Sequence, residues 1–222
     1  MPTALLLGST GLVGRHTLER LARDPRWTRV VTLDRRAVAP VSVTHVPTVV
    51  DFDRLDRLAP DVWACDSVFC ALGTTIKQAG SQAAFRRVDL EIPADVARRT
   101  RAAGATQMLL VSSLGADAGS RIFYNRVKGE AEAAVSAAGF EAVQIVQPSL
   151  LTGDRAEART GERIGEAVLG VLRPLFVGPL QNLRPTAADD VAAALVALAV
   201  AHRPGVNRYS PVAIRAWAGA AR

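Results

Sequence analysis

Two side chains that can move protons, Tyr124 and Lys128, stand four residues apart in a segment that is expected to be helical. Residues four apart lie on one face of a helix, so the phenol and the ammonium group should be neighbours. A nearby positive charge stabilises a phenolate, which makes a phenol usable as a general acid or base. The alternative is a surface pair with no chemical role.

Lysine is scarce in this chain, which makes Lys128 more informative. Of the 27 lysine and arginine residues, only Lys77 and Lys128 are lysines. Arginine therefore supplies ordinary positive charge, and a lysine is expected where a compact ammonium group with an adjustable pKa is needed. Ser112 and Ser113, at the end of the preceding predicted strand, place a hydroxyl donor close in sequence to Tyr124.

A second pattern stands at the start of the chain, where an apolar run at residues 5–7 precedes three glycines spaced by three. The seven residues of this glycine loop are Gly8, Ser9, Thr10, Gly11, Leu12, Val13 and Gly14. A strand, a glycine turn and a helix N-terminus together form an anion site, because free N–H groups and the helix dipole favour a phosphate there. The loop therefore predicts a dinucleotide site, with a purely structural turn as the alternative.

The residues after the second predicted strand bear on which dinucleotide binds. Asp34 stands twenty positions after the loop's last residue, and a carboxylate there accepts hydrogen bonds from an adenosine ribose, the NAD preference. Arg35 and Arg36 follow at once, and guanidinium groups suit a ribose 2′-phosphate, the NADP preference. The adjacent arginines favour NADP(H), with NAD(H) as the alternative, unless they belong only to a solvated loop.

Alternating strands and helices predict the fold. Strands are expected over residues 30–33, 45–50, 67–71, 108–111, 142–146 and 206–209 in addition to 5–7. Helices are expected over residues 12–24, 80–103 with a break at Pro93, 124–138, 164–176 broken at Pro174, and from a cap at Asp189 and Asp190 to residue 201. This order predicts a Rossmann-like, doubly wound parallel sheet with helices on both faces. Residues 1–222 form one domain in this interpretation, with a small substrate lobe at 151–188.

Ligands of such sheets bind beyond the carboxyl ends of the strands. Asp51 follows the third predicted strand, where it either reaches the adenine edge or caps the next helix. Four further residues follow the fourth strand and are predicted to line the cofactor: Ala71, Leu72, Gly73 and Thr74.

Composition excludes several other classes of function. The chain is 49% hydrophobic with a net charge of +6, and its arginines are spread out rather than gathered into a basic tract, which argues against nucleic-acid binding. The three histidines are isolated, and Cys65 and Cys70 lack metal-ligand spacing, so no metal site is expected. The absence of a long apolar run or leader, together with only two cysteines, favours a cytoplasmic protein that does not bind membranes.

The glycine loop, the Tyr124-x-x-x-Lys128 spacing and the upstream serine resemble the short-chain dehydrogenase/reductase superfamily. Two longer stretches resemble its atypical subgroup that includes the Tat-interacting tumour suppressor: residues 70–81 with 85–89, and residues 112–117 with Tyr124 and 128–130. The resemblance covers nearly the whole chain. It implies a Rossmann fold, a bound dinucleotide and an oxidoreductase activity.

The resemblance also implies individual roles. Tyr124 would donate or accept a proton, and Lys128 would bind the nicotinamide ribose. Ser113 would hold the substrate oxygen, with Ser112 as the fallback, and Pro148 and Ser149 would flank the nicotinamide. One position departs from the pattern, because Asp89 stands where the superfamily has an asparagine in its proton relay. An ionised carboxylate cannot donate a hydrogen bond, which puts that relay in question.

Two functions follow as hypotheses. The first is an NADP(H)-dependent oxidoreductase acting on a small carbonyl or alcohol, with residues 151–184 as an apolar substrate wall. The second is a non-catalytic NADP(H)-sensing regulator, suggested by Asp89, by the short lobe and by relatives described as regulators. Either protein is expected to be a monomer or a homodimer.

Overall fold

The computed structural model describes residues 2–153 and 178–220, and within these ranges seven parallel strands form one sheet. The sheet order is β3-β2-β1-β4-β5-β6-β9. From β1 the chain runs outward to the β3 edge, and from β4 it runs outward to the β9 edge. This is the predicted doubly wound arrangement, and it is confirmed. The strand bounds are β1 Thr3–Leu7, β2 Arg29–Asp34, β3 His45–Val49, β4 Ser67–Cys70, β5 Gln107–Val111, β6 Ala142–Val146 and β9 Gly205–Tyr209.

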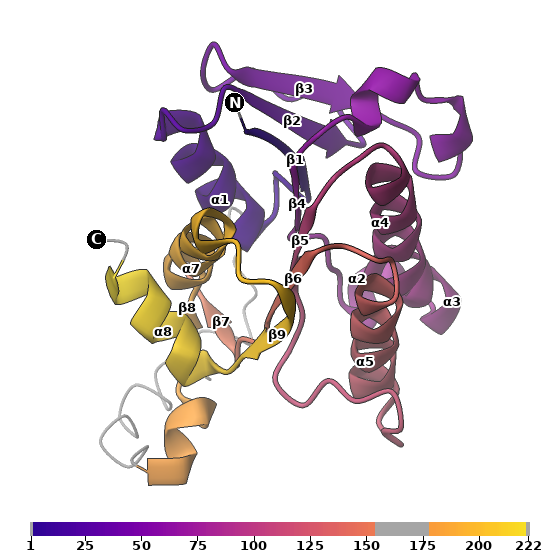
Figure 1. Ribbon diagram of the computed structural model, residues 1–222. Coiled ribbons are helices and arrows are strands. Elements are labelled where there is room, and N and C mark those ends of the chain that lie inside the picture. Colours follow the sequence, from indigo (N-terminus) through magenta and orange to yellow (C-terminus); the bar gives the residue numbers. More distant parts are fainter. Residues whose placement is uncertain (1, 154–177, 221–222) are drawn as a thin grey trace.

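Helices cover both faces of the sheet (Figure 1). One face carries α1 (Leu12–Arg23), α7 (Ala188–Ala201) and α8 (Pro211–Ala220). The other face carries α2 (Ile76–Ala79), α3 (Gln82–Arg86), α4 (Ile92–Ala102) and α5 (Phe123–Ser136). The remaining elements are short: the helical turns η1 (Leu55–Arg57), η2 (Pro60–Trp63), η3 (Arg87–Glu91) and η5 (Gly178–Leu183), and a separate parallel pair, β7 (Leu151–Thr152) with β8 (Thr186–Ala187).

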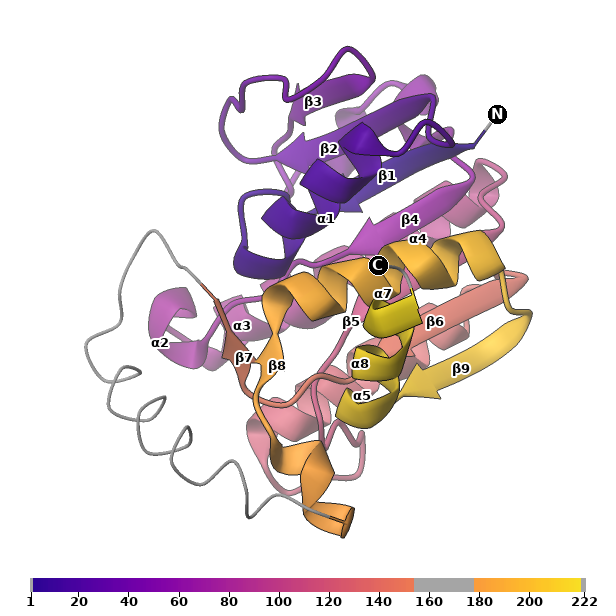
Figure 2. The ribbon, with the colours of Figure 1, turned by 90° about the vertical axis from the view of Figure 1, so that its left-hand side faces the viewer.

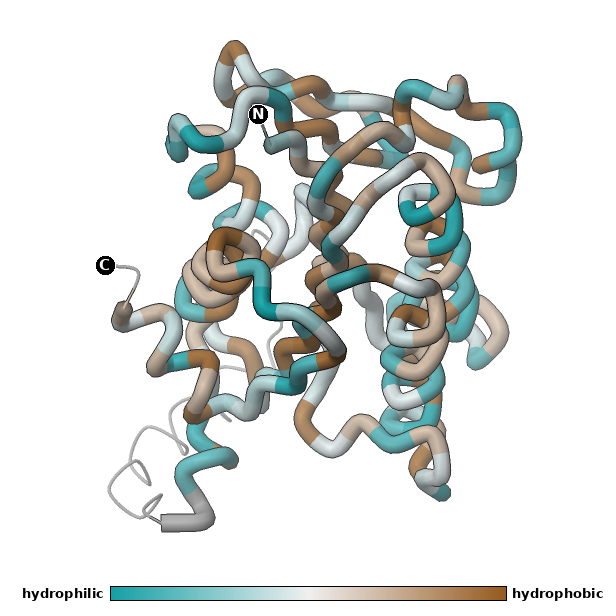
Figure 3. The backbone as a smooth tube through the Cα atoms, in the orientation of Figure 1, coloured by the Kyte–Doolittle hydropathy of each residue, from teal (hydrophilic) through white to brown (hydrophobic). Residues whose placement is uncertain are grey.

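The core lies in two layers, one on each side of the sheet, because successive strand residues point to opposite faces. In β1, Leu5 and Leu7 pack with α4 and α5, whereas Ala4 and Leu6 pack with α1 and α7. The central strands are buried on both faces, and Figure 3 shows their hydrophobic residues in the middle of the molecule. The sheet is therefore rigidly held, and its carboxyl-end loops have a fixed platform.

The predicted helix over residues 80–103 is divided in the structure. It consists of α3, the π-helical turn η3 and α4, with Pro93 in the first turn of α4. A proline inside an α-helix lacks the N–H that would bond to the carbonyl four residues earlier, and its ring clashes with that carbonyl. The π-helical turn widens the helix before Pro93, with Ile92 N–H bonded to the Arg87 carbonyl. The expected break is thus a local widening centred on Asp89.

Other boundaries differ in smaller ways. Asp189 and Asp190 lie in the first turn of α7 and do not cap it, because Ala187 occupies the N-cap position. Carboxylates in the first turn still complement the helix dipole. The predictions did not include α8, β7 or β8. The predicted helix over 164–176 and most of the polar segment 152–160 lie outside the described residues.

Buried His45, at the start of β3, predicts acid sensitivity. Its Nδ1 accepts a hydrogen bond from Val41 N–H at 3.2 Å, and its Nε2 lies 3.0 Å from Thr32 Oγ1. Burial lowers the pKa of His45 below its usual value of 6.5, although the charge of Asp34 acts in the opposite direction. Protonation of His45 then favours the unfolded chain. The unfolding free energy is therefore not reduced by His45 above pH 6.5, and it declines as the pH falls below that value.

Urea unfolding between pH 7.5 and pH 5 measures this effect. We expect His45→Gln, which keeps a polar side chain that does not titrate, to flatten the decline in unfolding free energy on acidification. His202→Asn, at an exposed position, should leave the decline unchanged. Equal slopes in the parent and in His45→Gln would contradict the assignment.

Candidate functional site

The glycine loop connects β1 to α1 at the carboxyl edge of the sheet. Gly8 has a positive φ of 80°, and Gly11 N–H donates to the Gly8 carbonyl at 2.9 Å. A Cβ on Gly14 would lie 1.9 Å from that same carbonyl oxygen, and a Cβ on Gly8 would lie 2.7 Å from the carbonyl oxygen of Ala71. Glycine is therefore required at both positions, and the loops after β1 and β4 are in contact.

The predicted adenosine end of the site lies beside this loop. Asp34 ends β2 and is buried, and the Ser9 hydroxyl donates a hydrogen bond to its Oδ1. Its Oδ2 is buried and has no hydrogen-bond partner among the described residues. Arg35 and Arg36 are exposed, and neither pairs with another described residue. Asp51 is exposed and accepts a hydrogen bond from Asp53 N–H at 2.9 Å, so its carboxylate stabilises a local turn.

These observations fit a dinucleotide. The close approach at Gly8 and Gly14 leaves backbone, rather than side chains, facing a ligand at the N-terminus of α1. An unpaired buried carboxylate oxygen costs free energy unless a donor reaches it, and a ribose hydroxyl is such a donor. Asp34, Arg35 and Arg36 thus retain the two opposed preferences that the sequence indicates.

The loop after β4 leads to a buried ion pair. Lys128 Nζ, on α5, lies 2.7 Å from Asp89 Oδ1, on the π-helical turn η3. Asp89 Oδ2 accepts a hydrogen bond from Thr74 N–H at 2.9 Å. A Cβ on Gly73 would lie 3.4 Å from Asp89 Oδ1 and 3.7 Å from Lys128 Nζ, so Gly73 lies directly against the pair.

Burial alone would lower the pKa of the Lys128 ammonium group, but the charge of Asp89, together with Tyr124, outweighs burial and raises that pKa above its usual value. Lys128 is therefore charged throughout the physiological range. Burial also raises the pKa of the neighbouring Cys70 thiol to about 11, which keeps it protonated at neutral pH.

Tyr124 lies at the start of α5, one turn before Lys128. Its ring is 5.7 Å from that of Phe85 on α3, centroid to centroid. Its hydroxyl group makes no hydrogen bond to the residues that the structure describes. The phenol is half-buried.

The loop after β5 carries Ser113 and lies against α5. Leu114 N–H donates to the Pro148 carbonyl at 2.9 Å, which joins the loops after β5 and β6. A Cβ on Gly129 would lie 2.1 Å from Ala118 N, so this glycine lets the loop cross the helix closely. Ser113 Oγ makes one long hydrogen bond, 3.3 Å, to the adjacent Leu114 carbonyl and is half-buried.

Ser112, the fallback for Ser113, has a different role. Its hydroxyl donates to buried Glu132 at 2.5 Å. The same carboxylate accepts hydrogen bonds from Gln147 Nε2 and Arg208 Nε, each at 2.8 Å. Glu132 thus joins the ends of β5, β6 and β9 to α5. Sequence reasoning missed it, although its position four residues after Lys128 places it on the same helix face.

Ser149 was expected beside the nicotinamide. Its hydroxyl donates to the Arg184 carbonyl and lies 2.9 Å from Thr186 Oγ1. It therefore ties the loop after β6 to β8. Pro148, next to it, is buried and contacts the Ser113 loop through its carbonyl.

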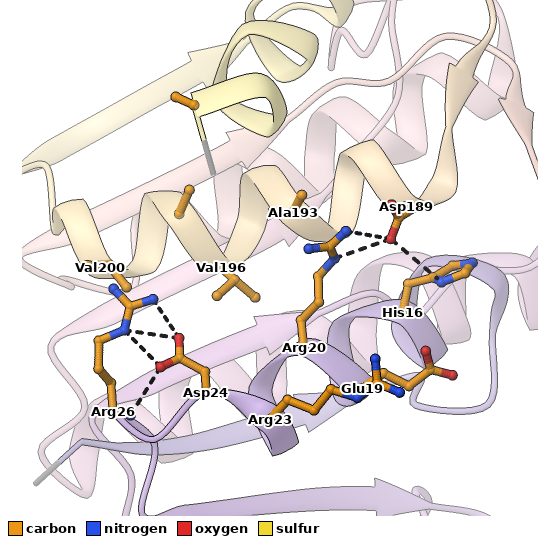
Figure 4. A pocket seen from close by; sticks show the side chains of 12 residues that line it. His16, Glu19, Arg20, Arg23, Asp24, Arg26, Asp189, Ala193, Val196 and Val200 are labelled. Atoms are coloured by element: carbon orange, nitrogen blue, oxygen red, sulfur yellow. Dashed lines mark hydrogen bonds and ion pairs between the residues drawn. The ribbon is translucent and has the colours of Figure 1, made fainter. Parts of the chain in front are cut away.

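A separate groove of about 690 Å³ lies between α1 and α7 (Figure 4). Arg20 pairs with Asp189 at 2.7 Å and Arg26 with Asp24 at 2.6 Å along its charged wall. Its lining residues on α1 and just beyond it are His16, Glu19, Arg20, Arg23, Asp24 and Arg26. Figure 2 shows α1 and α7 side by side on the face opposite α5. None of the predicted site residues lines this groove.

Two further properties concern the described residues alone. None of their helices combines the length and the apolar character needed to cross a membrane. No three of their His, Cys, Asp or Glu side chains gather into a group suited to holding a metal ion.

Comparison with known proteins agrees with the geometry. The family described as NAD(P)H-binding matches residues 8–202. The protein "fmp52, mitochondrial" of Emericella nidulans is 36% identical over 182 residues, covering 78% of this chain and 76% of that protein. Protein HTATIP2 of Rattus norvegicus is 34% identical over 173 residues, covering 77% of this chain and 71% of that protein.

Solved structures show the same fold. MoeE5 in complex with UDP-glucose and NAD superposes with a TM-score of 0.69 at 19% identity, covering 93% of this chain and 75% of that one. A putative NAD-dependent epimerase/dehydratase from Bacillus halodurans gives 0.65 at 16% identity, covering 94% and 92%. With its family match and its HTATIP2 and fmp52 relatives, the chain belongs to the NAD(P)H-binding family, as an atypical short-chain dehydrogenase/reductase.

Proposed function

We propose that this protein is an NADP(H)-dependent oxidoreductase that acts on a small carbonyl or alcohol. The observation that carries the proposal is the placement of Tyr124 and Lys128 on α5, beside the loops that follow β4, β5 and β6. A half-buried phenol with a free hydroxyl, one helical turn from a charged lysine, suits proton transfer to or from a substrate oxygen.

In this proposal each residue has one task. The bound dinucleotide would supply or accept the hydride. Tyr124 moves the proton, and Ser113 donates a hydrogen bond to the substrate oxygen. Lys128 contacts the nicotinamide ribose, and backbone N–H groups of the glycine loop bind the pyrophosphate. Pro148 and Ser149 shape the nicotinamide wall.

The preference for NADP(H) rests on Arg35 and Arg36. Both are exposed and unpaired within the described chain, so they are available to a 2′-phosphate. Asp34 opposes them, because its Oδ2 suits a ribose hydroxyl. Because two arginine charges attract a 2′-phosphate more strongly than one carboxylate repels it, we propose that NADP(H) binds more tightly than NAD(H).

The substrate lobe begins beside the cofactor loop. A Cβ on Gly153 would lie 3.2 Å from the side chain of Leu12 in the glycine loop. The strand β7, which directly precedes Gly153, pairs with β8. We place the substrate wall in residues 151–184, of which 151–153 and 178–184 are described. The apolar residues in the undescribed part of this segment favour an apolar ligand.

A non-catalytic NADP(H)-sensing regulator is the second candidate. It is favoured by Asp89, which replaces the relay asparagine of the superfamily and pairs with Lys128 instead. We propose a cytoplasmic location. Cys65 and Cys70 are buried and form no disulfide, which suits any reducing compartment, including the cytoplasm. The fmp52 relatives, in contrast, carry "mitochondrial" in their names. A fluorescent fusion protein distinguishes the two compartments, and light scattering distinguishes a monomer from a homodimer.

A panel of aldehydes, ketones and quinones tests the catalytic proposal. We expect at least one class to consume NADPH, followed by absorbance at 340 nm, at a rate that requires the protein. Tight NADPH binding without consumption across the panel would contradict the catalytic proposal and support the sensing function.

A further inference from the structure

Asp89 places a carboxylate against the Lys128 ammonium group, which stands one helical turn after Tyr124 on α5. Both side chains are buried, and Lys128 Nζ lies 2.7 Å from Asp89 Oδ1. The other carboxylate oxygen is held by Thr74 N–H, and Gly73 packs against the pair, so the contact is fixed from two loops. An ammonium group with a carboxylate at contact distance acts on a third group mainly as a dipole, and its field falls off quickly.

We propose that Asp89 offsets the charge of Lys128 at Tyr124, so that the site works as a proton donor, in the direction of carbonyl reduction. This inference rests on the proposed function of the same site. Asp89 is a positioning residue in this account, because it acts through Lys128 and through the charge that Tyr124 experiences.

The titratable groups on α3, α5 and β4 considered next do not add a negative charge that could replace that of Asp89. From α3, Arg86 reaches Glu130 on α5 at 2.6 Å, and these two charges balance each other. From β4, Cys70 is a protonated thiol at neutral pH, because burial raises its pKa to about 11. Replacing Asp89 by a neutral residue would therefore leave the Lys128 ammonium uncompensated next to the phenol.

The direction follows from the proton balance. In reduction, the carbonyl carbon gains a hydride from the reduced dinucleotide and the carbonyl oxygen gains the Tyr124 proton. The products are an alcohol and the oxidised dinucleotide, and the phenolate regains its proton from water. In oxidation, Tyr124 must begin as a phenolate, which an uncompensated lysine would favour and the Asp89–Lys128 pair does not.

Ionisation of Tyr124 in the protein without cofactor tests the inference. The chain has two tyrosines, so labelling tyrosine with ¹³C at Cζ gives two signals, which Tyr124→Phe assigns. We expect the Tyr124 signal to titrate about one to three pH units lower in Asp89→Asn than in the parent. Glu91→Gln is the matched control, because Glu91 lies on the same π-helical turn with a side chain that is 52% exposed. This variant should leave the titration of the Tyr124 signal unchanged.

A second variant covers the case in which Asp89→Asn, with its unpaired buried lysine, does not fold. Asp89→Asn with Lys128→Met replaces the whole pair by neutral groups, which leaves no buried charge without a partner. We expect its Tyr124 to titrate within about half a pH unit of the parent, since the ion pair and the neutral pair place similar net charge nearby.

Two results would overturn the inference. One is a folded Asp89→Asn variant whose Tyr124 titrates as in the parent. The other is a double variant whose Tyr124 titrates about one unit or more above the parent, which would show that the lysine charge dominates in the native site. Neither measurement involves cofactor or substrate, so failure of the proposed oxidoreductase function would be recognised separately by the carbonyl panel.

Discussion

Tyr124→Phe is expected to reduce turnover about 10²- to 10⁴-fold while NADPH affinity stays close to that of the parent. The substitution removes one hydroxyl group that makes no hydrogen bond within the described residues, so little stability is lost. The ring packing against Phe85, at 5.7 Å, is kept. The loss therefore falls on proton transfer and appears in kcat rather than in binding.

Tyr209→Phe provides the matched control, because Tyr209 is the other tyrosine of the chain. Tyr209 is buried in the core layer of α1 and α7, on the face of the sheet opposite α5, and its hydroxyl donates to Gln144 Oε1 at 2.7 Å. Its loss should cost about 1 kcal/mol of unfolding free energy and leave turnover unchanged. A Tyr124→Phe protein that matches the parent in kcat would exclude this residue as the proton donor.

Gly14→Ala is expected to abolish the thermal stabilisation that NADPH gives the parent. The new Cβ would lie 1.9 Å from the Gly8 carbonyl oxygen, so either the glycine loop or the start of α1 must move. Overpacking of this kind costs about 1–3 kcal/mol, and here it displaces the N–H groups that would face the pyrophosphate. Melting curves with and without NADPH measure both effects.

Two other glycine-to-alanine variants serve as comparisons for Gly14→Ala. A Cβ on Gly11 would lie 3.2 Å from the same carbonyl oxygen, so Gly11→Ala should weaken NADPH binding less than Gly14→Ala. A Cβ on Gly219, in α8, meets nothing within 4 Å, and Gly219→Ala should leave NADPH stabilisation intact. If Gly14→Ala is stabilised by NADPH as strongly as the parent, the dinucleotide does not bind at the glycine loop.

The sequence predicts the sheet well because its signals are local. The buried strands are short apolar runs; the glycine spacing follows one of them directly, and Asp34 is the last residue of another. The structure confirms the strand at 142–146 at both ends. The α8 helix was missed although it begins at Pro211, and proline at the first position of a helix is a start signal. The strands β7 and β8 have two residues each, which is too few to show a periodicity.

The side-chain network of the site could be predicted only in part. The Tyr124 and Lys128 spacing is local to one helix, and sequence reasoning identified it. Asp89 and Lys128 are 39 positions apart in the sequence. Their contact depends on a π-helical turn, which no residue pattern predicts. Glu132 was missed because its partners are also distant in sequence: Ser112 follows β5, Gln147 follows β6, and Arg208 lies in β9.

Calorimetric titration with NADPH and NADH tests the central claim most directly. We predict that the parent binds one NADPH per chain more tightly than NADH, and that Arg35→Ala with Arg36→Ala removes this difference while NADH binding is retained. Such a result would assign the 2′-phosphate to these arginines. Binding of neither dinucleotide by the folded parent would contradict the account, because the glycine loop would then be only a structural turn.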